Sequence, residues 1–123
     1  MRRAILAAVL ASGMAAGSVP AIAQPDLATQ GEAAFKALGC GSCHIAGEGD
    51  QAPWLGGVAG RKIGGVMGFP YCESLAKKGG SWDDSSLDAF LADTQAFAPG
   101  CAMSFKVEPA QRKALIAYLK TLK

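Results

Sequence analysis

The pentapeptide Cys40-Gly41-Ser42-Cys43-His44 decides how the rest of the chain is interpreted. Two cysteines three positions apart, followed at once by a histidine, form the attachment signature of a c-type haem. This spacing sets both sulfur atoms opposite the vinyl groups of one porphyrin, where they form thioethers, and places the histidine beneath the iron. The pentapeptide therefore predicts one haem c, bound covalently through Cys40 and Cys43, with His44 as an axial ligand.

Three other interpretations of the cysteine pair are a thioredoxin-like redox pair, half of a zinc site and a simple disulfide. A zinc site needs further Cys or His ligands, but His44 is the only histidine in the chain. A thioredoxin-like pair belongs in a β-α-β context, and the sequence shows no such pattern. Haem attachment is therefore the favoured interpretation.

Residues 1–23 have the features of a secretory signal peptide. A basic start is followed by an apolar run from Ala4 to about Ala16 and by small residues up to Ala23. We expect cleavage after Ala23, export to the periplasm and one mature domain over residues 24–123. The apolar run is shorter than the roughly 20 residues that span a bilayer, so an uncleaved anchor is the weaker alternative.

The charge balance provides no evidence for a nucleic-acid or anionic membrane partner. The whole chain has 12 basic and 10 acidic residues, and the two totals become equal once Arg2 and Arg3 leave with the signal peptide. Haem propionates would add negative charge. Because a domain of this size buries only a limited core, we expect the mature chain to fold poorly without its haem.

Hydrophobic periodicity predicts an all-α fold, with no strand pattern, internal repeat or second domain. Residues 47–68 are rich in glycine and predict a long functional loop. Asp26 is a candidate cap for the first helix, and Pro109 suits the first position of the last one. The expected helical segments are 27–42, 73–78, 83–92, a short turn near 94–98, and a last helix from 108–109 that carries Leu115, Ile116, Tyr118, Leu119 and Leu122.

A second axial ligand has to come from a methionine, because no second histidine exists. The candidates in the mature chain are Met67, in the glycine-rich loop, and Met103, which lies between two expected helices. Met103 follows His44 at a distance that allows the chain to wrap over the opposite haem face. A thioether ligand is typical of low-spin c-type haem. Met103 is the favoured ligand, and a role as apolar filler is its alternative.

The mature chain resembles the small class I cytochromes c of mitochondria and bacterial periplasms over almost its whole length. Besides the haem motif, the matching stretches are Pro53-Trp54-Leu55-Gly56-Gly57, Gly60-Arg61-Lys62, Phe69-Pro70-Tyr71, Trp82, Pro99-Gly100, Met103, Phe105 and Leu115–Lys120. The resemblance implies the class I cytochrome c fold, in which the terminal helices cross over the covalently bound haem, with Gly31 and Phe35 packed against Leu115 and Tyr118.

The resemblance also implies roles for residues around the haem. Pro53 would accept a hydrogen bond from the outer ring N–H of His44. Arg61, Tyr71 and Trp82 would surround a buried propionate and offset its desolvation. Their alternatives are a surface arginine and ordinary aromatic core.

The chain departs from the family pattern at several places. Cys72 and Cys101 stand where members often carry threonines near the propionates, which suggests a disulfide in an oxidising compartment; two reduced thiols are the alternative. Phe90 and Leu75 replace a tyrosine and an asparagine, which predicts a drier pocket. Lysines that ring the haem edge in mitochondrial members are absent at Gly39, Gln95, Ala96 and Ala102.

These features predict a soluble, monomeric periplasmic carrier of one electron, with redox proteins as its donor and acceptor, and not an enzyme. Ligation by His44 and Met103 would close both axial positions of the iron. One alternative is an electron-accepting subunit held in a stable complex with a periplasmic dehydrogenase. The other is a sensor or enzyme with an open iron, which would require Met103 not to bind.

Overall fold

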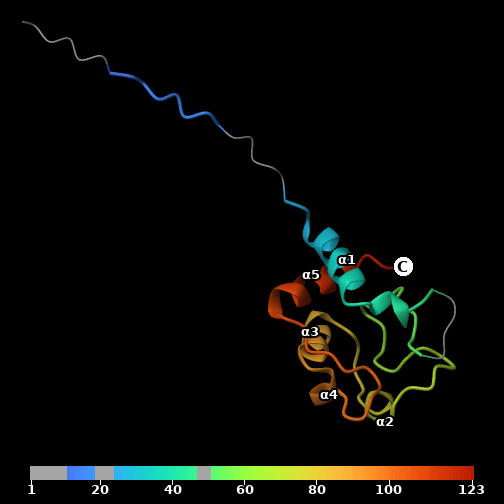
Figure 1. Ribbon diagram of the computed structural model, residues 1–123. Coiled ribbons are helices and arrows are strands. Elements are labelled where there is room, and N and C mark those ends of the chain that lie inside the picture. The colour runs from blue at the N-terminus through green and yellow to red at the C-terminus, as the bar shows by residue number, and fades with distance from the viewer. Residues whose placement is uncertain (1–10, 19–23, 47–50) are drawn as a thin grey trace, which may run out of the picture.

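The computed structural model describes residues 11–18, 24–46 and 51–123. Their only strand-like feature is an isolated antiparallel bridge between Lys62 and Ser81, so the predicted all-α class is confirmed for this part of the chain. The regular elements are α1 (Leu27–Ala37), the 3₁₀ turn η1 (Cys40–Ser42), α2 (Glu73–Ala76), α3 (Asp84–Ala92), α4 (Thr94–Phe97) and α5 (Pro109–Leu119), as Figure 1 shows.

Much of the expected signal peptide, including the cleavage site after Ala23, lies outside the described residues. Residues 11–18 are exposed and form no regular secondary structure. Across the described segments, no helix has both the length and the apolar character needed to cross a membrane.

Helix α1 begins where the sequence predicts and ends earlier. Asp26 caps it by accepting a hydrogen bond from the Thr29 N–H at 2.8 Å. The prediction of one helix through residue 42 is wrong, because α1 ends at Ala37. Gly39 then adopts a left-handed conformation (φ 73°), which a residue with a side chain rarely takes. The chain turns there and continues into η1.

Helices α1 and α5 form the main helix pair and cross at Gly31, as expected (Figure 1). A Cβ atom on Gly31 would lie 1.9 Å from the Ala114 carbonyl oxygen and 2.7 Å from the Tyr118 Cβ, so only glycine fits. The Phe35 ring meets the Tyr118 ring edge-on, with centroids 5.3 Å apart. The crossing joins the two ends of the domain.

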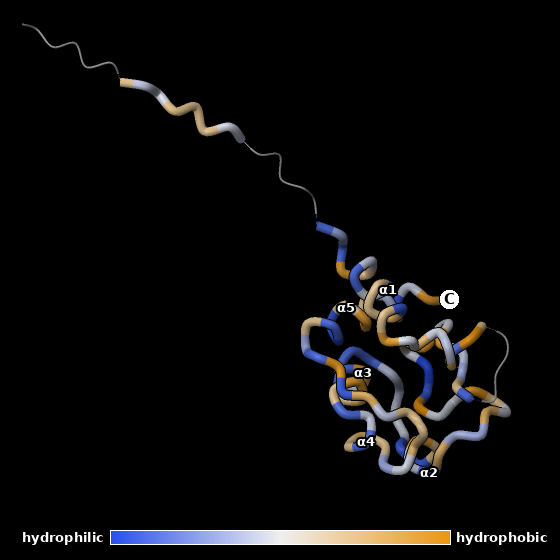
Figure 2. Tube along the Cα trace, viewed as in Figure 1, coloured by the Kyte–Doolittle hydropathy of each residue, from blue (hydrophilic) through white to orange (hydrophobic). Residues whose placement is uncertain are grey.

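Helices α3 and α4 meet at Asp93, which caps α4 by accepting a hydrogen bond from the Ala96 N–H. A capping box of Asp83 and Ser86 begins α3. The tube in Figure 2 mixes polar and apolar residues along α3 and α5, as helices with one buried face require. The core contains Ala34, Val58, Ile63, Trp82, Leu87, Phe90, Leu91, Ala98, Cys101, Val107, Leu115, Ile116 and Leu119.

The Gly31→Ala variant tests the helix crossing. Alanine favours a helix by about 1 kcal/mol over glycine, but here its Cβ would force the two helices apart. We expect a net loss of about 2 kcal/mol in the free energy of unfolding, measured on the holoprotein by denaturant titration. Ala33→Val, on the exposed side of α1, is the control and should stay within about 0.5 kcal/mol. An unchanged Gly31→Ala variant would contradict the crossing.

Candidate haem site

The haem-attachment motif lies at the end of α1 and follows the left-handed turn at Gly39. The N–H groups of Cys43 and His44 both donate to the Cys40 carbonyl, at 3.3 and 3.0 Å. This tight turn sets Cys40, Cys43 and His44 on the wall of one cavity. Both cysteines are outside any disulfide and are free for thioether formation.

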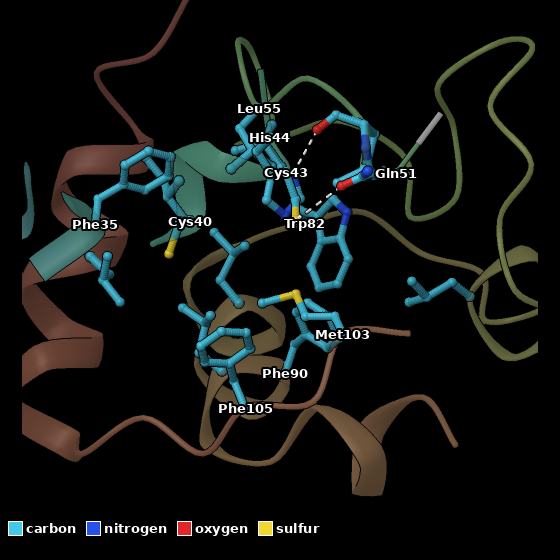
Figure 3. A pocket seen from close by; sticks show the side chains of 18 of the residues that line it. Phe35, Cys40, Cys43, His44, Gln51, Leu55, Trp82, Phe90, Met103 and Phe105 are labelled. Carbon is cyan, nitrogen blue, oxygen red and sulfur yellow. Dashed lines mark hydrogen bonds between the residues drawn. The ribbon is translucent and has the colours of Figure 1, made fainter. Parts of the chain in front are cut away.

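The cavity has a volume of about 630 Å³, within the range of cofactor sites. Figure 3 shows the side chains of several elements converging on it. Its lining is formed by Phe35, Gly39, Cys40, Cys43, His44, Gln51, Ala52, Pro53, Leu55, Val58, Arg61, Tyr71, Leu75, Trp82, Leu87, Phe90, Leu91, Ala102, Met103, Phe105, Leu115 and Leu119. Most of these side chains are apolar, which suits a porphyrin plane.

His44 is oriented by the backbone of the following loop. Its Nδ1 lies 2.7 Å from the Pro53 carbonyl oxygen, which can only accept, so Nδ1 carries the proton and Nε2 keeps its lone pair. Burial is the main cause that lowers the pKa of His44, so the neutral, metal-binding form predominates at neutral pH. The Pro53 carbonyl thus lies within hydrogen-bonding distance of the ring nitrogen of His44 that faces away from the proposed metal-binding side.

Arg61 lines the cavity and has a hydrogen-bond donor without an acceptor among the described residues. Its Nη1 donates to the carbonyl oxygens of Trp54 and Gly56, at 2.9 and 3.3 Å. Its Nε is buried and has no partner among the described residues. A buried donor without an acceptor is costly, and an anionic group bound in the cavity would satisfy it. The residues therefore fit a cofactor that carries a carboxylate, as haem does.

Tyr71 and Trp82 line the same cavity as Arg61. The Tyr71 hydroxyl accepts a hydrogen bond from the Val66 N–H at 3.1 Å, which leaves its own proton available for donation. Trp82 is buried and stacks with Phe97, with ring centroids 5.7 Å apart. The three residues that the resemblance groups around a propionate therefore line one cavity.

Met103 enters the cavity from the side opposite His44 (Figure 3). It lies in the segment between α4 and α5 that has no regular secondary structure. The other candidate, Met67, is 97% exposed and is not part of the cavity wall. Phe90 and Leu75 also line the cavity. Their side chains offer no hydroxyl or amide group to it, in line with the predicted drier pocket.

The structure brings Cys72 and Cys101 together, with Cα atoms 5.3 Å apart. This separation lies within the range of natural disulfides. Two further contacts tie the region of α2 to the same segment: Ser74 Oγ donates to the Pro99 carbonyl, and Lys78 Nζ donates to the Phe97 carbonyl at 2.7 Å.

Sequence analysis did not identify Thr94 and Gln95, at the start of α4, as part of the site. Thr94 is fully buried and its Oγ1 donates to the Met103 carbonyl at 2.8 Å, while Gln95 Nε2 donates to the same oxygen at 2.9 Å. A side chain that bonds to a carbonyl eight or nine residues away produces no periodic pattern. Only the Asp93 cap marks the position of these two residues in the sequence.

The described residues define a c-type haem pocket: a paired-cysteine anchor, an oriented imidazole, an apolar cavity and a buried cationic donor. No group of three or more His, Cys, Asp or Glu side chains that could hold a metal occurs in the described part of the chain. The zinc alternative thus finds no additional ligands there.

Comparison with known proteins agrees with this geometry. The cytochrome c family profile matches residues 28–123. Cytochrome c2 iso-2 of Magnetospirillum fulvum is 42% identical over 87 residues, which cover 68% of this chain and 91% of the relative. Cytochrome c-550 of Ancylobacter novellus is 39% identical over 90 residues, which cover 67% of this chain and 84% of the relative.

Solved structures show the same fold. Cytochrome cH from Methylobacterium extorquens superimposes with a TM-score of 0.69 and 38% identity, over 76% of this chain and 97% of that chain. Ferricytochrome c2 from Rhodopseudomonas palustris gives a TM-score of 0.67 and 35% identity, over 78% and 98% of the two chains. The chain belongs to the cytochrome c family, and the predicted fold and covalent haem c on the motif Cys40–His44 are confirmed.

Proposed function

We propose that residues 24–123 form a soluble, monomeric periplasmic carrier of one electron, whose haem iron is ligated by His44 and Met103. Electron transfer itself follows from membership of the cytochrome c family. The observation that carries the ligation is the placement of His44 and Met103 on opposite sides of the cavity, with the His44 Nε2 left unprotonated.

The haem supplies the one-electron chemistry, and the protein supplies its environment. Ligation by the His44 imidazole and the Met103 thioether would close both axial positions and raise the reduction potential. A closed iron does not offer a site for oxygen or peroxide, which favours a carrier over an enzyme. Arg61, Tyr71 and Trp82 would hold one propionate, and the buried Arg61 Nε would donate to it.

Export to the periplasm rests on the sequence pattern of residues 1–23 and on the chemistry of the cysteines. A Cys72–Cys101 disulfide persists in an oxidising compartment and is rare in the cytosol. The signal peptide would be removed after Ala23, and the mature chain would not insert into the membrane.

The cavity opens at a rim that can pass electrons to redox partners. Among the described residues, its exposed lining is formed by Gly39, Cys43, Gln51, Ala102 and Phe105, and none of these carries a charge. Lys106, which follows Phe105, forms an ion pair with Asp93, with Nζ and Oδ2 3.6 Å apart. Phe105, Ala102 and Ala96 are all exposed and would provide apolar contact with a donor or acceptor.

Met103→Ala tests the ligation and the closed iron together. The haem should stay attached through Cys40 and Cys43, but one axial face should open. We expect the ferric variant to bind cyanide at least about tenfold more tightly than the parent, a difference of about 1.4 kcal/mol. Met67→Ala removes a methionine outside the cavity and should match the parent in a spectrophotometric titration. Equal cyanide affinity in the parent and Met103→Ala would refute Met103 as the ligand.

The proposed disulfide has a test of its own. It would close a loop with a sequence separation of 29 residues, which the chain-entropy model relates to about 3.5 kcal/mol of stability. It would also restrain the segment that must move when the methionine leaves the iron. We expect the Cys72→Thr/Cys101→Thr variant to lose its methionine ligand at a lower pH than the parent, followed by absorption spectroscopy.

Two free thiols in the native protein, detected by mass spectrometry after alkylation, would contradict the disulfide. A double variant that keeps its methionine to the same pH as the parent would contradict the restraint.

The lack of charge on the described rim residues predicts weak electrostatic steering of partners. Electron-transfer rates with the native partner should change less than about twofold between about 0.01 and 0.15 M salt, because long-range attraction needs unpaired charge. Ala102→Lys adds a charge at the rim and should introduce salt dependence in the same stopped-flow measurement. A steep fall in the parent's rate over this range would show that a charged patch guides docking.

A further inference from the structure

The segment that carries Met103 has few backbone hydrogen bonds within itself. Between Pro99 and Lys106 the chain forms no helix or strand. Its one local backbone bond, from the Cys101 N–H to the Ala98 carbonyl, is 3.3 Å long. The backbone polar groups of this segment therefore need partners elsewhere.

Thr94 provides several of these partners. Its hydroxyl donates to the Met103 carbonyl at 2.8 Å and accepts from the Phe105 N–H at 2.8 Å, while its own N–H donates to the Phe105 carbonyl at 3.1 Å. The hydroxyl uses its single proton on Met103, because the Phe105 oxygen is farther away, at 3.3 Å. Thr94 has no solvent exposure, so water cannot replace these bonds in place.

Gln95 uses both ends of its amide on the same segment. Its Nε2 donates to the carbonyl oxygens of Cys101 and Met103, at 2.7 and 2.9 Å. Its Oε1 accepts from the Gly100 N–H at 3.1 Å. Thr94 and Gln95 together form hydrogen bonds with the backbone at four positions between Gly100 and Phe105. The Met103 carbonyl accepts one hydrogen bond from each of the two side chains.

These contacts matter because a methionine side chain has three rotatable bonds and its thioether is a neutral ligand. The sulfur stays at the iron only if the Met103 backbone is held at a fixed distance from it. Helix α4 can hold the Met103 backbone in this way, because the Asp93 cap fixes the first turn, where Thr94 and Gln95 lie.

We propose that Thr94 and Gln95 are positioning residues that hold the Met103 thioether on the haem iron through its backbone. The inference rests on the proposed ligation by Met103. Besides any contribution to stability, the two adjacent side chains would keep Met103 bound to the iron and so prevent other ligands from binding there.

Paired substitutions separate the hydrogen bonds from the shape of each side chain. Thr94→Val keeps the shape but removes the hydroxyl, whereas Thr94→Ser keeps the hydroxyl. Gln95→Glu keeps the acceptor for Gly100 but removes both donors, and Gln95→Ala removes all three bonds. Gln111→Ala makes the same change at an exposed position of α5 and is the matched control.

Imidazole binding to the ferric holoprotein is the main measurement. We expect Thr94→Val, Gln95→Glu and Gln95→Ala to bind imidazole at least about tenfold more tightly than the parent, because carbonyls left unpaired release the segment. Thr94→Ser and Gln111→Ala should match the parent. The absorption band of the sulfur–iron bond should weaken at a lower pH in the first three variants only.

Amide hydrogen exchange measures the restraint independently of the iron. The Gly100 N–H should exchange faster in Gln95→Ala, and the Phe105 N–H should exchange faster in Thr94→Val. A purely structural role would lower the free energy of unfolding without changing imidazole affinity under native conditions. If Thr94→Val fails to fold, the two variants at the half-buried Gln95 provide the same test.

Met103→Ala distinguishes the possible failures. If it opens the iron to imidazole while the Thr94→Val and Gln95 variants bind like the parent, the positioning role is overturned and the ligation stands. If Met103→Ala also binds like the parent, the ligation itself is wrong and the positioning role falls with it.

Discussion

The structure depends on an apolar cavity at its centre that a covalently attached haem has to fill. Side chains from distant parts of the chain, such as Phe35, Leu87 and Leu115, face this space. Protein interiors are close-packed, and a void of about 630 Å³ would forfeit many contacts between those side chains. The haem is therefore part of the hydrophobic core, and the two thioethers prevent its loss. Part of the hydrophobic core, including Leu87 and Leu115, therefore also forms the wall of the haem cavity.

Several backbone carbonyls beside this pocket belong to irregular chain and not to helices. Loops leave backbone carbonyls without helical partners, and buried carbonyls need donors. Arg61 donates to the carbonyls of Trp54 and Gly56 on the His44 side. Thr94 and Gln95 donate to the carbonyl of Met103 on the other side. The same side chains thus satisfy the loops and set the positions of groups that face the haem.

The crossing of α1 and α5 closes this arrangement. The C-terminal end continues from α5 onto the loop after the haem motif, where the Gly57 N–H donates to the Leu122 carbonyl at 3.0 Å. Gly31 permits the close approach of the helices. Because α1 leads directly into the attachment turn, the packing of the terminal helices also positions Cys40 and Cys43. Stability and cofactor geometry therefore depend on the same contacts.

Local chemistry in the sequence determined the cofactor, the fold class and most helix positions. The spacing of Cys40, Cys43 and His44 specifies a covalent haem. Asp26, as an N-cap, and Pro109, at the first helical position, mark helix starts that the structure reproduces. The end of α1 was predicted too late, because the helical pattern continues past Ala37 while the left-handed Gly39 turns the chain. A single glycine can act in this way without changing hydrophobic periodicity.

Only the tertiary structure decided which side chains serve the site across large sequence distances. In the sequence, Gln95 is singled out only because mitochondrial members carry a lysine at this position. In the fold, it makes three hydrogen bonds to the segment that contains Met103. The resemblance implies that Arg61 lies near a propionate, but only the structure shows that its Nε is buried and has no partner among the described residues. Hydrogen bonds from side chains to distant carbonyls follow from how loops pack, and loop packing has no period that a sequence pattern can display.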